Sequence, residues 1–242
     1  MGRIGVISDI HGNLEALIAV LKYFDELKCD EIIHTGDVVD IGPSSRECLE
    51  LLLSRRDATL LLGNHDRDFA LNESTARKFS HVPTEHKRQV FSSMNDALRK
   101  QVAAFPLKTT RVCGGDRILF AHYALNEGPF DMSVFPFKPL VQRPSAEIFD
   151  EMFDGVDAKA VFFGHKHEPC DIRGRILYVD VGSVGCYPEP FARGIVIDYD
   201  ELRWSYRRVA VPYDMEKTRR QMRQIAAGED LYDFYFLHAK RK

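Results

Sequence analysis

Apolar residues near the start of the chain alternate between short continuous runs and runs with helical spacing. The stretches 3–8, 31–36 and 58–63 are short and apolar, which is typical of buried strands. Between them, 13–27 and 44–55 repeat apolar residues every three or four positions, which predicts two amphipathic helices. Strands that alternate with helices in this way indicate right-handed βαβ units, a mainly parallel sheet and an α/β fold.

The pattern that follows is helical first and then strand-like. The clearest helix of a polar stretch lies at 84–105, so we expect a helical insertion near 67–105. Residues 107–122 predict a hairpin, because two strand-like runs flank a Gly-Gly-Asp sequence that favours a tight turn.

The second half of the chain predicts more strands than helices. Near 124–144 the chain is rich in proline and aromatic residues, and we expect a lid-like loop over one face. A short helix is predicted over 145–153. Three strand-rich regions and a C-terminal tail of two helices are predicted at 159–165, 170–183, 191–209 and 212–239. Because neither a repeat nor a linker interrupts the pattern, we expect residues 1–242 to form a single domain with two sheets and flanking helices.

Composition and charge narrow the class of protein. The 242 residues are 45% hydrophobic and 29% charged, with a formal net charge of −3, which provides no overall basic field for nucleic acid or a membrane surface. The five cysteines are far apart, so we expect neither a disulfide framework nor a thiolate zinc site. No apolar run reaches the roughly 20 residues of a membrane span, and no apolar leader precedes the first strand. We therefore expect a cytoplasmic protein with reduced thiols.

Side chains that can bind metal ions follow the ends of the predicted strands. The sequences SDIHG, GDVVD, GNHD, FAH and GHKH each stand where an apolar run ends. Because ligands of α/β sheets bind outside the carboxyl ends of the strands, we expect these side chains to meet in one crevice. The candidate metal ligands are Asp9, His11, Asp37, Asn64, His122, His165 and His167.

The number and chemistry of these candidates predict two metal ions. Imidazole nitrogens with carboxylate or amide oxygens suit divalent or mixed-valence transition metals such as Mn, Fe, Zn, Co or Ni, and we favour Mn and Fe. Seven ligands are too many for one tetrahedral zinc, but they fit two metals that share a carboxylate about 3.5–4 Å apart. Such a pair lowers the pKa of a bridging water and neutralises charge on a phosphoryl group, so the predicted reaction is attack of a metal-bridging hydroxide on a phosphoester.

Two residues of the GNHD sequence are left for proton transfer. We expect His65 to donate a proton to the leaving oxygen and Asp66 to fix the tautomer and orientation of that imidazole. Gly63 is expected to let the backbone turn closely enough to deliver Asn64 and His65 to the site.

These five sequences stand in order over residues 9–167 and resemble the calcineurin-like metallophosphoesterases. The segment 180–190 also resembles the small bacterial phosphodiesterase branch, which is described as diadenosine-tetraphosphatase-like. The resemblance implies a four-layer αββα sandwich of two mixed β-sheets flanked by helices. It also implies that Asp37 bridges two metals, of which one is held by Asp9, His11 and His167 and the other by Asn64, His122 and His165.

Two departures from other members of that superfamily bear on the substrate. Protein phosphatases and symmetrical tetraphosphatases usually have a phosphate-binding arginine where this chain has Ile41, and those phosphatases have glutamate at the position of Asp66. We therefore favour a small-molecule phosphodiester or a dinucleoside polyphosphate as substrate. The alternatives are a phosphomonoesterase of the same fold and a non-catalytic metal-binding scaffold, while the net charge opposes a nuclease.

Further polar and aromatic residues are candidates for supporting roles. We expect Asp40 to support the site without binding metal, His34 to lie in the core, and His81 and His86 to be solvated. The aromatic stretch of the lid-like loop could stack a nucleobase, bury its own rings or face a partner subunit. Candidate phosphate or substrate contacts, for each of which ordinary surface is the favoured interpretation, are Arg46, Tyr123, Lys138 and Arg143.

Overall fold

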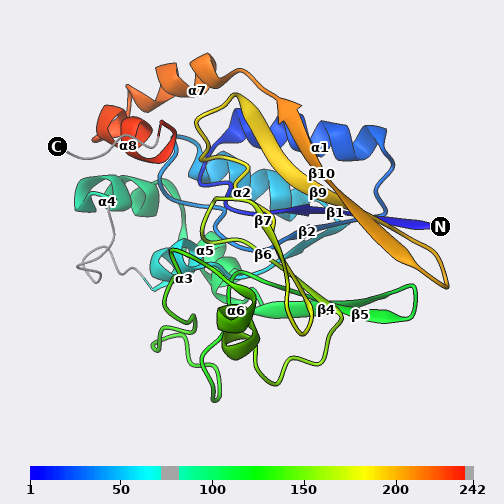
Figure 1. The fold of residues 1–242 in the computed structure, drawn as a ribbon. Coiled ribbons are helices and arrows are strands. Elements are labelled where there is room, and N and C mark those ends of the chain that lie inside the picture. The colour runs from blue at the N-terminus through cyan, green and yellow to red at the C-terminus, as the bar shows by residue number, and fades with distance from the viewer. Residues whose placement is uncertain (72–81, 238–242) are drawn as a thin grey trace.

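Two five-stranded β-sheets pack face to face in the computed structural model, which describes residues 1–71 and 82–237 (Figure 1). In strand order, the first sheet comprises β10 (Trp204–Pro212), β9 (Phe191–Tyr199), β1 (Gly2–Ile7), β2 (Glu31–His34) and β3 (Ala58–Leu60). The second comprises β4 (Lys108–Cys113), β5 (Asp116–Ala121), β6 (Ala160–Phe163), β8 (Leu177–Asp180) and β7 (Cys170–Arg173). Each sheet has three parallel strands next to antiparallel ones, so both are mixed.

Helices cover the outer faces of both sheets. α1 (Leu14–Glu26) and α2 (Ser45–Ser54) pack against the first sheet, and α6 (Ala146–Met152) packs against the second. The predicted four-layer αββα sandwich is therefore confirmed. The remaining helices are α3 (Asn64–Ala70), α4 (Thr84–Ser93), α5 (Asp96–Ala103), α7 (Met215–Met222) and α8 (Gly228–Tyr235).

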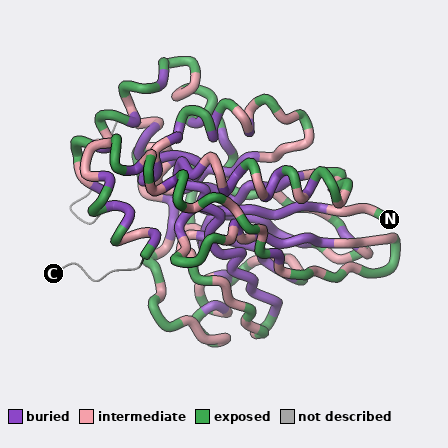
Figure 2. The backbone as a smooth tube through the Cα atoms, turned by 90° about the horizontal axis from the view of Figure 1, so that it is seen from above, coloured by how far each residue is buried: buried purple, intermediate pink, exposed green. Residues whose placement is uncertain are grey.

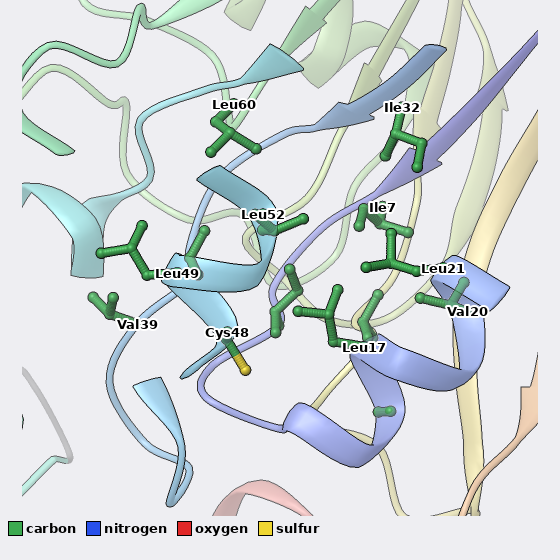
Figure 3. Close-up of a cluster of buried hydrophobic side chains, with 14 of the residues drawn as sticks. Ile7, Leu17, Val20, Leu21, Ile32, Val39, Cys48, Leu49, Leu52 and Leu60 are labelled. Carbon is green, nitrogen blue, oxygen red and sulfur yellow. The ribbon is translucent and has the colours of Figure 1, made fainter. Parts of the chain in front are cut away.

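Successive side chains of a strand point to opposite faces of its sheet, and together they fill the three spaces between the four layers. In β1, Val6 points toward the second sheet, while Ile7 packs with Leu17 and Leu49 beneath α1 and α2 (Figure 3). In β6, Phe162 lies between the sheets and its neighbour in the chain packs beneath α6. The buried backbone accordingly follows the strands, and the exposed backbone follows loops and outer helix turns (Figure 2).

The helix predicted over 84–105 is in fact two helices, α4 and α5. The chain is extended at Met94, and the side chain of Asn95 accepts a hydrogen bond from the backbone N–H of Leu98, which caps α5. The apolar spacing continues through the break, so the spacing alone did not reveal it. Part of the predicted insertion, including His81, lies outside the described residues.

One loop region completes the description. Residues 124–144 contain neither a helix nor a strand, and their one backbone bridge pairs Leu125 with Phe137. Within 1–71 and 82–237, no helix is long and apolar enough to cross a membrane.

Candidate metal centre

The predicted metal ligands lie where parallel strands end. Loops that follow β1, β2 and β3 contribute from the first sheet, and loops that follow β5 and β6 contribute from the second. The centre therefore joins the two sheets at one edge of the sandwich. In chain order, its side chains are Asp9, His11, Asp37, Asn64, His122, His165 and His167.

The backbone is strained at most of these positions. Asp9, His11, Asp37, His165 and His167 all have positive φ values, from 47° to 77°. This left-handed region is uncommon for residues other than glycine and costs on the order of 1–3 kcal/mol per residue. Five such residues in one place show that the surrounding loops hold these side chains in fixed directions.

Glycines allow the loops to approach one another. A Cβ atom on Gly63 would lie 2.0 Å from Asp37 Oδ1, and one on Gly164 would lie 1.9 Å from Ser8 Oγ. The expected role of Gly63 in a close turn is therefore confirmed. The reason is space rather than backbone freedom, since its φ of −96° suits any residue.

The first group of ligands surrounds one point between the sheets. His11 Nε2 and His167 Nε2 are 3.0 Å apart, and Asp9 Oδ1 lies 3.7 Å and 3.4 Å from these two nitrogens. Asp9 Oδ1 is buried without a hydrogen-bond partner among the described residues. An unpaired carboxylate oxygen beside two ring nitrogens fits a bound cation.

The second group has the same character. His122 Nε2 lies 2.9 Å from Asn64 Oδ1 and 3.1 Å from His165 Nδ1. Metal–nitrogen bonds of about 2.1 Å at right angles place neighbouring ligand atoms about 3 Å apart. The spacing of these three atoms is therefore the spacing of ligands around one metal ion.

Asp37 lies between the two groups. Its Oδ2 is 3.8 Å from His11 Nε2 and 3.3 Å from His122 Nε2. Its other oxygen accepts a hydrogen bond of 2.8 Å from the backbone N–H of His65, which fixes the carboxylate plane. Oδ2 is therefore directed toward both ligand groups.

The orientation of His65 differs from the prediction. Its Nδ1 lies 2.7 Å from Asp40 Oδ2, so the carboxylate that holds this imidazole belongs to Asp40 rather than to Asp66. The expected contact between Asp66 and the His65 ring is wrong. The role expected for Asp40, support without metal binding, agrees with this geometry.

Asp66 instead fastens the start of α3 to the loop after β2. Its carboxylate accepts hydrogen bonds from the backbone N–H groups of Asp37, Val38, Val39 and Gly63, at 2.7 to 3.2 Å. α3 begins at Asn64, so Asp66 stands in its first turn, where its buried side chain faces these donors. Asp66 thereby positions Asp37 through the backbone.

His86 was expected to be solvated, and the structure corrects this. It is 1% exposed on α4, and its Nε2 lies 3.6 Å from Asp40 Oδ1. Val90, one helical turn later, is buried as well, so this spacing was the signal that marked the inner face of α4. His34 lies in the core as predicted.

The charges of the centre favour cations. Burial alone would raise the pKa of Asp9, but the neighbouring His11 and His167 imidazoles hold it well below its usual range. Burial lowers the pKa of His165 to about 3, which keeps this imidazole neutral and able to bind metal. Burial also opposes the protonation of His122, but the charge of Asp37 overcomes it and raises the His122 pKa to about 9. A positive charge is thus stabilised next to Asp37.

One side of the centre is open to solvent. Asp9, His11, Asp37 and His122 are buried, whereas the remaining ligands and His65 are partly exposed. A substrate can therefore reach the centre from the side of His65. The partly exposed side chains are Asn64, His65, His165 and His167.

The four candidate substrate contacts lie in different environments. Arg46 pairs with Glu50 on the exposed face of α2, and Arg143 is exposed. Tyr123 is 1% exposed, and its ring lies 5.0 Å from that of His165. Lys138 lines a cavity of about 1000 Å³ between β4, β5 and the end of α6. Among the described residues, Tyr123 is the one of these four whose ring contacts a candidate ligand.

Comparisons with known proteins agree on one family of phosphoesterases. The family model for calcineurin-like phosphoesterases matches residues 2–169. An uncharacterised protein of Methanocaldococcus jannaschii is 28% identical over 97% of both chains. A symmetrical bis(5′-nucleosyl)-tetraphosphatase of an Enterobacter species is 41% identical over 63 residues, which are 25% of this chain and 22% of that enzyme.

A solved structure shares the fold. The crystal structure of a metallophosphoesterase from Sphaerobacter thermophilus superposes with a TM-score of 0.74 and 25% sequence identity, covering 95% of this chain and 96% of that one. The resemblance stated from the five sequence blocks is therefore confirmed at the level of the family.

Proposed function

Because the chain belongs to the calcineurin-like phosphoesterase family, we propose that this phosphoester hydrolase is a two-metal phosphodiesterase whose substrate is a phosphodiester or a dinucleoside polyphosphate. The observation that carries the proposal is the position of Asp37 Oδ2, 3.8 Å and 3.3 Å from one imidazole of each ligand group. One shared carboxylate between two complete sets of ligands is the arrangement that a two-metal centre requires.

The chain's residues divide into those that hold metal and one that moves a proton. Asp9, His11 and His167 would hold one metal, Asn64, His122 and His165 the other, and Asp37 both. When bound, the metals lower the pKa of water and neutralise phosphoryl charge.

His65 is the proton donor in this proposal. Asp40 occupies Nδ1, so Nε2 is the ring nitrogen left to protonate the leaving oxygen. Burial lowers the pKa of His65, but the charges of Asp37 and Asp40 outweigh this effect and raise it to about 9. In the metal-free protein the imidazole therefore carries a proton at neutral pH.

The surroundings of Ile41 favour a diester over a monoester. Ile41 is fully buried and packs with Met222, Leu231 and Phe236 of the C-terminal tail. An apolar side chain offers no hydrogen bond to the second negative charge of a phosphomonoester. The partial match to a tetraphosphatase is consistent with a nucleotide substrate.

The experiment compares hydrolysis of bis(p-nitrophenyl) phosphate and p-nitrophenyl phosphate, with Mn²⁺ added or chelated. We expect metal-dependent cleavage of the diester to exceed that of the monoester and to be abolished in Asp37→Asn. Faster cleavage of the monoester would favour the phosphomonoesterase. Folded protein that binds two metals and cleaves neither ester would favour the scaffold.

A further inference from the structure

The loop of residues 131–137, here called the clamp loop, is joined to α3 by hydrogen bonds from a buried arginine. Arg67 lies on α3 one turn after Asn64, and its side chain is 3% exposed. Its Nε donates to the carbonyl of Met132 at 2.9 Å, and Nη2 donates to the carbonyl of Ser133 at 3.1 Å. A single guanidinium thus joins the helix that carries Asn64 to this loop.

The other end of the clamp loop packs against the second group of ligands. Phe137 is 1% exposed, and its ring meets the His122 ring edge-on, with centroids 5.2 Å apart. The same ring stacks on His165 at 6.4 Å with an interplanar angle of 24°. Phe135 lies between, 5.5 Å from Phe137 and 5.8 Å from the guanidinium carbon of Arg67.

The imidazole of His122 depends on this packing for its orientation. Metal-binding histidines usually donate their second ring nitrogen to a carboxylate or carbonyl, which fixes the ring. Nδ1 of His122 is buried and has no hydrogen-bond partner among the described residues. Contact with Phe137 is therefore one constraint on the ring that can take the place of that hydrogen bond.

We propose that Arg67 is a positioning residue for the second metal position and acts through the clamp loop and Phe137 on His122 and His165. The proposal rests on the two-metal function proposed above. It makes the predicted lid-like loop a fixed wall of the centre over residues 131–137. Arginine suits this role because its planar fork reaches two carbonyl groups at once, whereas lysine offers a single ammonium.

The experiment measures Mn²⁺ binding to metal-stripped protein by isothermal titration calorimetry, with bound metal checked by elemental analysis. We expect wild-type protein to bind two equivalents. In Arg67→Met the first equivalent should keep its affinity and the second should weaken by about 10- to 100-fold, the usual effect of losing a group that orients a ligand. Arg67→Lys should fall between the two.

Two further variants separate positioning from general loss of structure. Phe137→Leu leaves Arg67 intact but removes the flat ring, and it should weaken the same second equivalent. Arg111→Met is the matched control, because Arg111 joins β4 to Glu31 and Thr59 through several hydrogen bonds near the start of β2. Its loss should leave both equivalents unchanged.

The outcomes are distinguishable. Equal weakening of both equivalents in Arg67→Met, or two unchanged equivalents in Arg67→Met or Phe137→Leu, would overturn the positioning role. If Arg67→Met fails to fold, Arg67→Lys decides, and an unchanged second equivalent in that variant would overturn the role of Arg67. Wild-type protein that binds fewer than two equivalents would contradict the two-metal proposal itself, and this inference with it.

Discussion

The proposed proton donor, His65, has the carboxylate of Asp40 at 2.7 Å from its Nδ1. Asp40 is held in its ionised form, because contact with the His65 imidazole outweighs the effect of burial and lowers the Asp40 pKa to about 2. This charge and that of Asp37 raise the His65 pKa, and bound metal would compensate the Asp37 share. Asp40 is therefore the partner that remains effective in the loaded enzyme.

Replacing Asp40 should change the pH dependence of catalysis. A general acid works only while protonated, so kcat falls as the pH rises through the pKa of His65. Asp40→Asn removes a negative charge that raises the His65 pKa, so the fall in kcat should move to lower pH by about one unit. The measurement is kcat against pH at saturating Mn²⁺, with Glu50→Gln as the control. An alkaline limb that stays in place would show that Asp40 does not set the His65 pKa.

Asp66 should matter for stability through the backbone that it fastens. Asp66→Ala leaves four backbone N–H groups without their acceptor, and an unsatisfied buried donor costs about 1–3 kcal/mol. We expect the free energy of unfolding of metal-free protein to fall by roughly 3 kcal/mol or more, measured in urea. Asp66→Asn keeps one acceptor oxygen and should lose less. A loss under 1 kcal/mol in Asp66→Ala would contradict this account.

The helices and strands that the sequence predicted best are those whose apolar residues recur with a regular spacing. The strands of both sheets, α1, α2 and the two tail helices follow from apolar spacing, and the clustering of the candidate metal ligands follows from their places at strand ends. The partner of His65 did not follow, because adjacency in sequence favoured Asp66, whereas the turn into α3 directs Asp66 toward backbone donors. Asp40 reaches the ring only through its left-handed backbone, with a φ of 74°.

At the break between α4 and α5, a helix-capping residue, Asn95, begins a new helix although the apolar spacing of the sequence continues. Asn95 accepts the N–H of Leu98 and begins α5 where apolar spacing alone would have continued the helix. Asn95→Ala should lower the free energy of unfolding by about 1 kcal/mol, the usual cost of a lost N-cap. Asn126→Ala would not serve as a control, since that amide ties two carbonyls of the 124–144 loop. A better control is Ser54→Ala at the exposed end of α2, and equal stability of Asn95→Ala and wild type would contradict the capping role.

At the scale of the whole molecule, the centre connects the two sheets. Asp9, His11, Asp37 and Asn64 follow strands of the first sheet, whereas His122, His165 and His167 follow strands of the second. A metal held by Asp9, His11 and His167 would take ligands from both sheets, and so would one held by Asn64, His122 and His165. Metal binding should therefore stabilise the whole sandwich rather than one loop.

Thermal unfolding with and without metal measures this connection. At Mn²⁺ concentrations 100 times its Kd, each site should add about 2.7 kcal/mol. For a chain of this size the midpoint should rise by roughly 5–10 °C per occupied site. Asp37→Asn should lose most of the rise, since its carboxylate would serve both proposed sites. If chelation leaves the midpoint of the wild-type protein unchanged, the folded protein binds Mn²⁺ no more tightly than the unfolded chain does, which would contradict the proposed metal centre.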